Sequence, residues 1–254
     1  NHPEVEVWER DIRDINVIEI KSKLNIGKWE LDLLAGCPPC QGFSTMRTLN
    51  GARKVEDPRN DLLFDFLRFA EELMPKTIML ENVPGLRKDK RFKAFCSRLE
   101  DIGYIVNDAI LNAENYGVPQ RRKRLICIMG YKKKIEFTRP FTRKYTVFQT
   151  IGSLPEPGLS GDPIHDLPEK RSPEVMARIR KIPKDGGSRT DLPEEDQLGC
   201  HKRCKGFKDV YGRMAWNDVA PTITSGCFNP SKGRFLHPEA DRAITLREAA
   251  LLQG

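Results

Sequence analysis

The sequence has no long apolar run, no compact group of cysteines and no internal repeat. A membrane-spanning helix needs roughly 18 or more predominantly apolar residues, and no stretch approaches that length. The seven cysteines are an odd number and are scattered along the chain, which favours a reducing compartment over a disulfide framework. The first residues are polar and acidic, so no signal peptide is visible. These absences predict a cytoplasmic protein.

The chain is long enough to fold around a substantial core. It has 254 residues, of which 39% are hydrophobic, so it corresponds to one large domain or two modest ones. Disorder as the main state is therefore excluded. The net charge of +7 is unevenly placed, because the window 120–144 alone carries +9. Such a basic stripe favours a polyanionic partner such as nucleic acid, although a solvated basic face is the equal alternative.

The hydrophobic pattern predicts strands that alternate with helices. The expected strands are 5–8, 31–36, 77–80, 104–111 and 124–129, and the expected helices are 61–74, 91–103 and 245–253. This order predicts an α/β domain with a mainly parallel sheet. In such sheets ligands bind beyond the carboxyl ends of the strands, so residues 37–40 and 81–83 are expected to face one pocket.

The composition changes near Phe141, after which prolines and a Gly-Gly pair divide the sequence into short segments. We therefore expect a second, loop-rich region after the α/β part. Near the end, Thr245 and Glu248 have the spacing of a capping box and predict the start of a helix.

Three groups of residues could carry chemistry. Cys40 follows a stiff Pro-Pro pair and is a candidate nucleophile, since a thiolate is strongly nucleophilic. Glu81 ends an apolar strand, where burial would let a carboxyl donate a proton. The run 120–124 adds fixed cations. Each has an ordinary alternative: a buried cysteine, a surface glutamate and a solvated basic run. A zinc site that joins Cys37 and Cys40 to Cys200 and Cys204 is the weakest alternative.

The joint pattern is more specific than any single group. Pro-Pro-Cys-Gln-Gly-Phe-Ser (38–44), Glu-Asn-Val (81–83), Gln-Arg-Arg-Lys-Arg (120–124) and the segment 242–254 occur in this order. Together they resemble the DNA cytosine-5 methyltransferase family of bacterial type, over essentially the whole chain. The resemblance implies a Rossmann-like, S-adenosylmethionine-dependent methyltransferase fold with a small loop-rich target-recognition domain.

The resemblance also assigns catalytic roles. Cys40 matches the nucleophile that attacks C6 of cytosine, and Glu81 matches the acid that protonates the ring at N3. Arg124 would hold the base and orient Glu81, while Arg122 would assist the cysteine site. The cytosine must leave the base stack, so base flipping is implied. The segment 45–58 resembles the loop that closes over the flipped base.

Cofactor and substrate residues follow from the same match. The cofactor S-adenosylmethionine would contact Asp11, Ile12, Pro39 and Leu62, and the substrate would contact Gln41, Ser44, Asn82 and Gln120. For Asp11 the alternative is a solvated loop acid. The family's glycine-rich cofactor loop would precede Asn1 and its last motif would follow Gly254. From this we expect an incomplete cofactor site and no methylation by this polypeptide alone.

The implied organisation is a catalytic domain at 1–140, a target-recognition domain at 141–236 and a return segment at 237–254. Candidate DNA contacts lie at 200–208 and 231–234, and 222–226 resembles the junction that precedes the return. The expected partners are double-stranded DNA and a cognate restriction endonuclease, with action at the bacterial nucleoid. Three alternatives stay open: a tRNA cytosine methyltransferase, an inactive DNA-binding fragment, and a zinc or redox module at Cys37 and Cys40.

Overall fold

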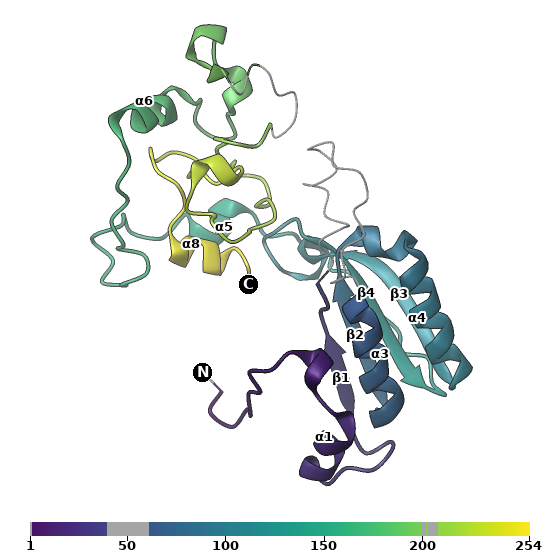
Figure 1. Ribbon diagram of the computed structural model, residues 1–254. Coiled ribbons are helices and arrows are strands. Elements are labelled where there is room, and N and C mark those ends of the chain that lie inside the picture. Colours follow the sequence, from purple (N-terminus) through teal and green to yellow (C-terminus); the bar gives the residue numbers. More distant parts are fainter. Residues whose placement is uncertain (1, 40–60, 200–201, 203–207) are drawn as a thin grey trace. The chain divides into compact units, whose positions relative to one another are not determined.

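The computed structural model describes residues 2–39, 61–199, 202 and 208–254 (Figure 1). It forms two compact units. Unit 1 comprises Asn1–Leu111 and Lys123–Thr138, and unit 2 comprises Asn112–Arg122 and Arg139–Gly254. The chain therefore enters unit 2 briefly at 112–122, returns to unit 1, and then stays in unit 2.

Unit 1 is built on a four-stranded sheet with the order β1-β2-β4-β3. The strands are β1 (Leu33–Gly36), β2 (Thr77–Asn82), β3 (Tyr104–Asn112) and β4 (Lys123–Tyr131). Four of the five strands predicted from sequence are thus confirmed. The fifth, at residues 5–8, is wrong. Val5 and Val7 are 56% and 75% exposed, and no strand pairs with this segment among the described residues.

The sheet is mixed, whereas the sequence predicted a mainly parallel one. β1 and β2 run parallel, but β2 and β4 run antiparallel. The reason lies in the connections. A helix of twelve residues links β2 to β3, whereas β3 reaches β4 through residues 113–122, which contain only the short 3-10 helix Ala113–Tyr116. Parallel neighbours need a crossover of about a dozen residues or more, so this short link suits a reversal of direction.

Helices α3 (Leu62–Leu73) and α4 (Lys90–Asp101) cover one face of the sheet (Figure 1). Both were predicted from their apolar spacing. Their inner side chains pack on alternate residues of β2 and β4, including Ile78, Leu80 and Leu125. The other face of β2 carries Met79 and Glu81, which are only half-buried. Burial on alternate residues therefore leaves the Glu81 face less covered.

Gly36 allows the end of β1 to approach α3 closely. A Cβ atom at this position would lie 2.5 Å from a ring carbon of Phe66. Phe66 cannot retreat freely, because its ring stacks on Phe95 with centroids 6.0 Å apart. A side chain at residue 36 would therefore push the strand end, and the loop that follows it, away from the core.

The amino-terminal part of unit 1 contains the 3-10 helix η1 (Ile12–Asp14) and helix α1 (Val17–Leu24). Val17 packs in a small cluster with Phe69 and Leu73 of α3. Arg68 adds two hydrogen bonds, from Nη2 to the Ile12 carbonyl and from Nη1 to the Ile15 carbonyl, each at 2.8 Å. The segment before the sheet is thus fixed on α3.

Unit 2 has short helices joined by long irregular segments, as the proline pattern predicted. The α-helices bounded by its described residues are α5 (Val147–Ile151), α6 (Pro173–Lys181) and α8 (Leu246–Leu251), with 3-10 helices at Ala113–Tyr116, Arg189–Asp191, Glu194–Asp196 and Pro230–Lys232. The predicted capping box is confirmed, because Thr245 Oγ1 accepts from the Glu248 amide and Glu248 bonds back to the Thr245 amide.

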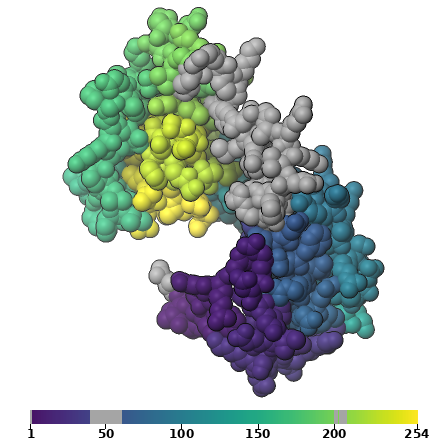
Figure 2. Space-filling model, viewed as in Figure 1, coloured from purple at the N-terminus to yellow at the C-terminus, as the bar shows by residue number. Residues whose placement is uncertain are grey.

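Two apolar clusters hold unit 2 together. One joins α5 and α8 through residues such as Ile151, Ala220 and Leu252, and the other surrounds Ile179 and Leu236. Figure 2 shows the carboxyl-terminal residues, in yellow, among the green residues of the same unit. The unit boundary at Thr138 lies near the predicted domain boundary at 140. Within the described ranges, no helix combines the length and the apolar character needed to cross a membrane.

Candidate active site

Glu81 and Arg124 form an ion pair at the carboxyl end of β2. Arg124 Nε lies 2.9 Å from Glu81 Oε1, and the two side chains are 22% and 27% exposed. The strand register explains the contact: Glu81 pairs with Ile126, and Arg124 lies two residues earlier on the same face of β4. Arg124 Nη1 also donates to the Lys123 carbonyl at 2.8 Å. The structure thus joins two of the predicted catalytic residues.

Cys37 lies beside Glu81. β1 and β2 are parallel with Gly36 opposite Leu80, so Cys37 and Glu81 are the next residues of neighbouring strands. Burial raises the pKa of the Cys37 thiol, and the negative charge of Glu81 raises this pKa further. Because the thiolate is the nucleophilic form, Cys37 is a weak nucleophile. The sequence indicated Cys37 only as part of a cysteine pair. Extending the strand register by one residue would have found its neighbour.

Asn82 ties the loop after β1 to the loop after β2. Its side chain is on the buried face and the residue is 3% exposed. Nδ2 donates to the Pro38 carbonyl at 2.9 Å, and Oδ1 accepts from the Val83 amide at 2.8 Å. Asn82 therefore holds Pro38, two residues before Cys40, against the strand that carries Glu81.

Several predicted residues lie outside the described part of the chain. These are Cys40, Gln41 and Ser44, the segment 45–58, and the cysteines Cys200 and Cys204. Of the four cysteines in the zinc alternative, only Cys37 is described. Among the described residues, no group of three or more histidine, cysteine or carboxylate side chains could hold a metal ion.

Arg122 and Gln120 belong to the part of unit 2 that precedes β4. The Arg122 amide donates to Asn112 Oδ1 at 3.0 Å, and its carbonyl accepts from the Ala113 amide at 3.0 Å. Gln120 is 1% exposed and is bonded inside unit 2. A residue so enclosed is not open to a substrate in this structure, so the predicted substrate contact at Gln120 has no support from its surroundings.

The predicted cofactor residues at 11 and 12 lie at the start of η1. Asp11 caps η1, and its two carboxylate oxygens accept hydrogen bonds from the Arg13 side chain at 2.9 and 2.5 Å. These bonds lower the pKa of Asp11 to about 2. The carboxylate is 39% exposed and keeps acceptor capacity for a further donor. An ionised, partly exposed acceptor fits the exocyclic amine of an adenine ring.

The other two predicted cofactor residues lie at the ends of structural elements in unit 1. Pro39 is exposed in the loop after β1, and half-buried Leu62 is the first residue of α3. Both positions present small apolar surfaces, which suit the uncharged parts of S-adenosylmethionine. The described residues therefore fit this cofactor.

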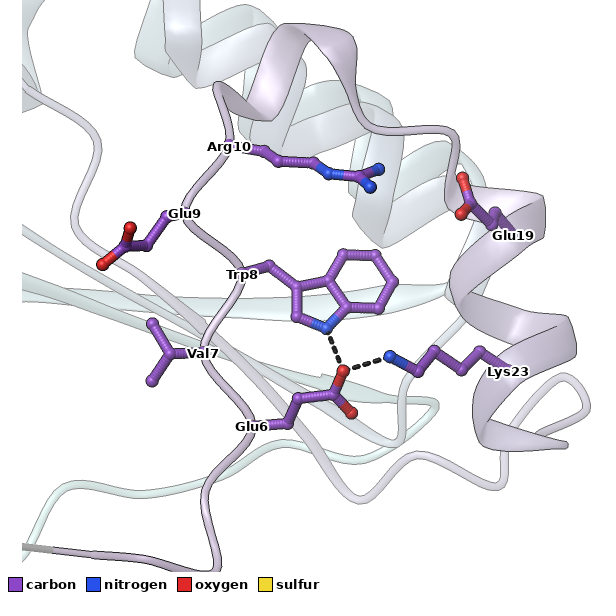
Figure 3. Close-up of a pocket in the computed structure, with 7 residues that line it drawn as sticks. All are labelled: Glu6, Val7, Trp8, Glu9, Arg10, Glu19 and Lys23. Atoms are coloured by element: carbon purple, nitrogen blue, oxygen red, sulfur yellow. Dashed lines mark hydrogen bonds and ion pairs between the residues drawn. The ribbon is translucent and has the colours of Figure 1, made fainter.

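A pocket of about 310 Å³ lies between residues 6–10 and α1 (Figure 3). Its main feature is the Trp8 indole, whose Nε1 donates to Glu6 Oε1 at 2.6 Å. The Lys23 ammonium lies 4.6 Å from the indole centroid and also contacts Glu6. None of the four predicted cofactor residues lines this pocket, although Asp11 follows directly after Arg10. The polar contacts of Trp8 are thus made to Glu6 and Lys23, which also line the pocket.

The basic window at 120–144 does not form one continuous stripe. Arg124 lies near the start of β4, and Lys132–Lys134 follow its end at Tyr131. A strand of nine residues spans roughly 30 Å. Arg121 is paired with Asp218 at 2.8 Å, and Lys134 with Glu136 at 2.6 Å. The interpretation of this window as one basic stripe is therefore wrong.

Comparison with known proteins identifies the family. A model of the C-5 cytosine-specific DNA methylase family matches residues 1–254. The chain is 38% identical over 264 residues to the Type II methylase M.HgiDII of Herpetosiphon aurantiacus. This match covers 98% of the chain and 70% of the relative. It is 35% identical to the Type II methyltransferase M1.BsuMI of Bacillus subtilis, over 88% of this chain and 52% of the relative.

A solved structure supports the fold. A DNA modification methyltransferase encoded within an Escherichia coli prophage matches with a TM-score of 0.66 and 22% sequence identity, and the match covers 97% of this chain and 74% of that one. The predicted α/β methyltransferase fold is thus confirmed, and so is the resemblance carried by the four sequence motifs. Enzymes of this family use S-adenosylmethionine. The chain belongs to the C-5 cytosine-specific DNA methylase family.

Proposed function

We propose that this chain forms the catalytic and DNA-recognising part of a Type II DNA cytosine-5 methyltransferase. The observation that carries the proposal is the Glu81–Arg124 ion pair at the carboxyl end of β2, next to the loop that leads to Cys40. A carboxyl and a guanidinium fixed side by side suit a cytosine ring, which offers N3 to a proton donor and O2 to a cation. The two relatives above are both Type II enzymes, which supports DNA as the substrate.

In the proposed reaction, the Cys40 thiolate adds to C6 of a cytosine that has left the base stack. A protonated Glu81 gives its proton to N3, so the ring accepts the electron pair. Arg124 holds Glu81 and the O2 atom. S-adenosylmethionine, when bound, supplies the methyl group that C5 receives. Transfer of the C5 proton to a base then expels the Cys40 thiolate, N3 returns its proton to Glu81, and the aromatic ring is restored.

The remaining residues position these groups. Asn82 anchors Pro38, which precedes Cys40 by two residues in the sequence. Arg122 supports the turn before β4 through its backbone bonds to residues 112 and 113. Asp11, Ile12, Pro39 and Leu62 are the proposed cofactor contacts, and Gln41 and Ser44 the proposed substrate contacts. The region 141–236 would recognise the DNA sequence.

The biological setting is also a proposal. A Type II methyltransferase protects DNA from a restriction endonuclease that acts on the same site, and we infer such a partner here. The enzyme would then act at the bacterial nucleoid, where its DNA substrate lies.

Methyl transfer to two substrates tests the proposed function. The full-length protein, with S-adenosylmethionine labelled in its methyl group, should label long double-stranded DNA and leave bulk tRNA unlabelled. It should also form a denaturation-resistant complex with DNA that contains 5-fluorocytosine, because fluorine at C5 prevents release of the enzyme. Cys40→Ala should abolish both signals, whereas Cys37→Ala should retain the covalent complex. A complex that survives Cys40→Ala would refute the nucleophile, and labelled tRNA would refute the substrate.

A further inference from the structure

Gln120 joins three segments of unit 2 that are far apart in the sequence. Its Nε2 donates to the Leu252 carbonyl at 3.2 Å, at the end of α8. Its Oε1 accepts from the Ile223 amide at 3.1 Å. The residue is 1% exposed, so both bonds are shielded from water. A buried amide with its donor and its acceptor both in use fixes its neighbours more firmly than a surface amide does.

The backbone around Gln120 is held by the same neighbours. Gln120 and Ala220 form a parallel bridge, in which the Arg121 amide donates to the Ala220 carbonyl at 2.8 Å and the Ala220 amide donates to the Pro119 carbonyl at 3.1 Å. Thr222 Oγ1 donates to the Arg121 carbonyl at 2.6 Å. Residues 119–121 therefore behave as an added strand on the segment 220–223.

The segment that Gln120 holds leads directly to the two arginines with proposed catalytic roles. Arg122 is two residues further along, and β4 begins at Lys123, followed by Arg124 on Glu81. The segment 220–223 lies in the last part of the proposed target-recognition region, and α8 belongs to the return segment that follows this region. Gln120 thus shares one set of hydrogen bonds with the segment 220–223 and with the end of α8, two residues before Arg122 in the sequence.

We propose that Gln120 is a positioning residue that couples the last part of the target-recognition region and the return segment to the placement of Arg122. It does not touch the base. It acts through the backbone of Arg121, which joins it to Arg122. Its contacts with Ile223 and Leu252 fix the position of the backbone at residue 120, from which the arginines follow. This inference rests on the proposed function, because it assumes that Arg122 assists the attack of Cys40 on cytosine.

The test compares Gln120→Met with Gln253→Met in the full-length protein. Methionine has nearly the volume of glutamine but makes neither hydrogen bond. Gln253 is a matched control, since it follows Leu252 and its side chain donates to the Ala249 carbonyl one turn earlier. The measurements are the dissociation constant for long duplex DNA, the melting temperature, and the single-turnover rate of covalent capture on 5-fluorocytosine DNA.

We expect Gln120→Met to slow capture by about tenfold, in the range of measured coupling effects, with the DNA dissociation constant changed less than about threefold. Gln253→Met should capture at the wild-type rate. Thr222→Val removes a second contact to the same segment without emptying a buried site, and should slow capture in the same direction.

Two outcomes would overturn the proposal separately from the proposed function. If the folded fraction of Gln120→Met captures DNA at the wild-type rate, Gln120 has only a structural role. If Gln120→Met does not fold, a wild-type rate in Thr222→Val overturns the proposal instead. Failure of the wild-type protein to capture or methylate DNA would refute the proposed function itself, and the coupling with it.

Discussion

Glu81 and Arg124 lie 2.9 Å apart across the antiparallel pair of β2 and β4, with neither side chain fully buried. The ion pair fixes the orientation of the Glu81 carboxylate, and the pair stays partly exposed. Arg124 uses Nε for Glu81 and Nη1 for a backbone carbonyl, and no described residue bonds to its Nη2. The pair can therefore receive a planar ring that offers both an acceptor and a basic nitrogen.

The first prediction concerns this pair. Glu81→Gln keeps a side chain of the same shape but cannot supply a proton, so methyl transfer should fall by about 10²–10⁴-fold. Arg124→Lys keeps the charge but loses the planar fork and should also slow transfer. The single-turnover methylation rates of the two single variants and of the double variant give the interaction energy between the two side chains. Strictly additive losses would contradict a shared role.

The second prediction concerns Asn82. Asn82→Ala leaves the Pro38 carbonyl and the Val83 amide without their partner, so stability should fall by about 1–3 kcal/mol. Covalent capture should slow as well, because Pro38 is released. Asn107→Ala is the control, since Asn107 Nδ2 donates to the Ile135 carbonyl at 2.8 Å in the same unit. It should lose stability without a slower capture; equal capture rates for both variants would exclude a role in loop placement.

The sequence predicts those features that depend on local spacing. The apolar residues of α3 recur at helical intervals, and both β2 and α8 begin within a residue of the expected position. The placement of Glu81 follows from one such feature, because it ends an apolar strand. Local alternation fails at residues 5–8, since a strand needs a partner that the pattern cannot reveal.

Contacts between distant segments were beyond sequence reasoning. The partners of Gln120 lie 103 and 132 residues away, so its amide could not be assigned to a structural role. The basic window shows the converse error. Its charges are close in sequence, but an extended strand separates Arg124 from Lys132. Charge summed along a sequence predicts a surface patch only where the backbone conformation keeps the charged residues close together in space.

The third prediction concerns Arg213, which is fully buried in unit 2. Its guanidinium donates to backbone carbonyls, including those of Ile182 and Ile179 at 3.1 and 3.0 Å, and to Asp241 Oδ1 at 2.6 Å. Arg213→Met should lower the free energy of unfolding by about 3–5 kcal/mol, because Asp241 and the carbonyls lose their partner. Urea unfolding measures this. Arg180→Met, at an exposed position, should change it by less than about 0.5 kcal/mol.

The last prediction concerns His237 and acid. Burial lowers the pKa of His237 to about 4, and the positive charge of Arg242 adds to this shift. The structure agrees, because Nδ1 accepts from the amides of Glu239 and Ala240 at 3.2 and 2.9 Å and must stay unprotonated to do so. Between the unfolded pKa of 6.5 and about 4, the unfolded chain binds a proton that the folded chain does not.

Stability should therefore be complete above pH 6.5 and fall as the pH drops towards 4. From pH 7 to 5 the loss from this one group is on the order of 2 kcal/mol. His237→Asn keeps an acceptor for the two amides but does not titrate, so its unfolding free energy should change less over this range. His2→Asn, at an exposed position, should keep the wild-type slope. Carboxyl groups titrate mainly below pH 5. If the unfolding free energy of His237→Asn fell between pH 7 and 5 as steeply as that of the wild type, His237 would not be the cause of the loss.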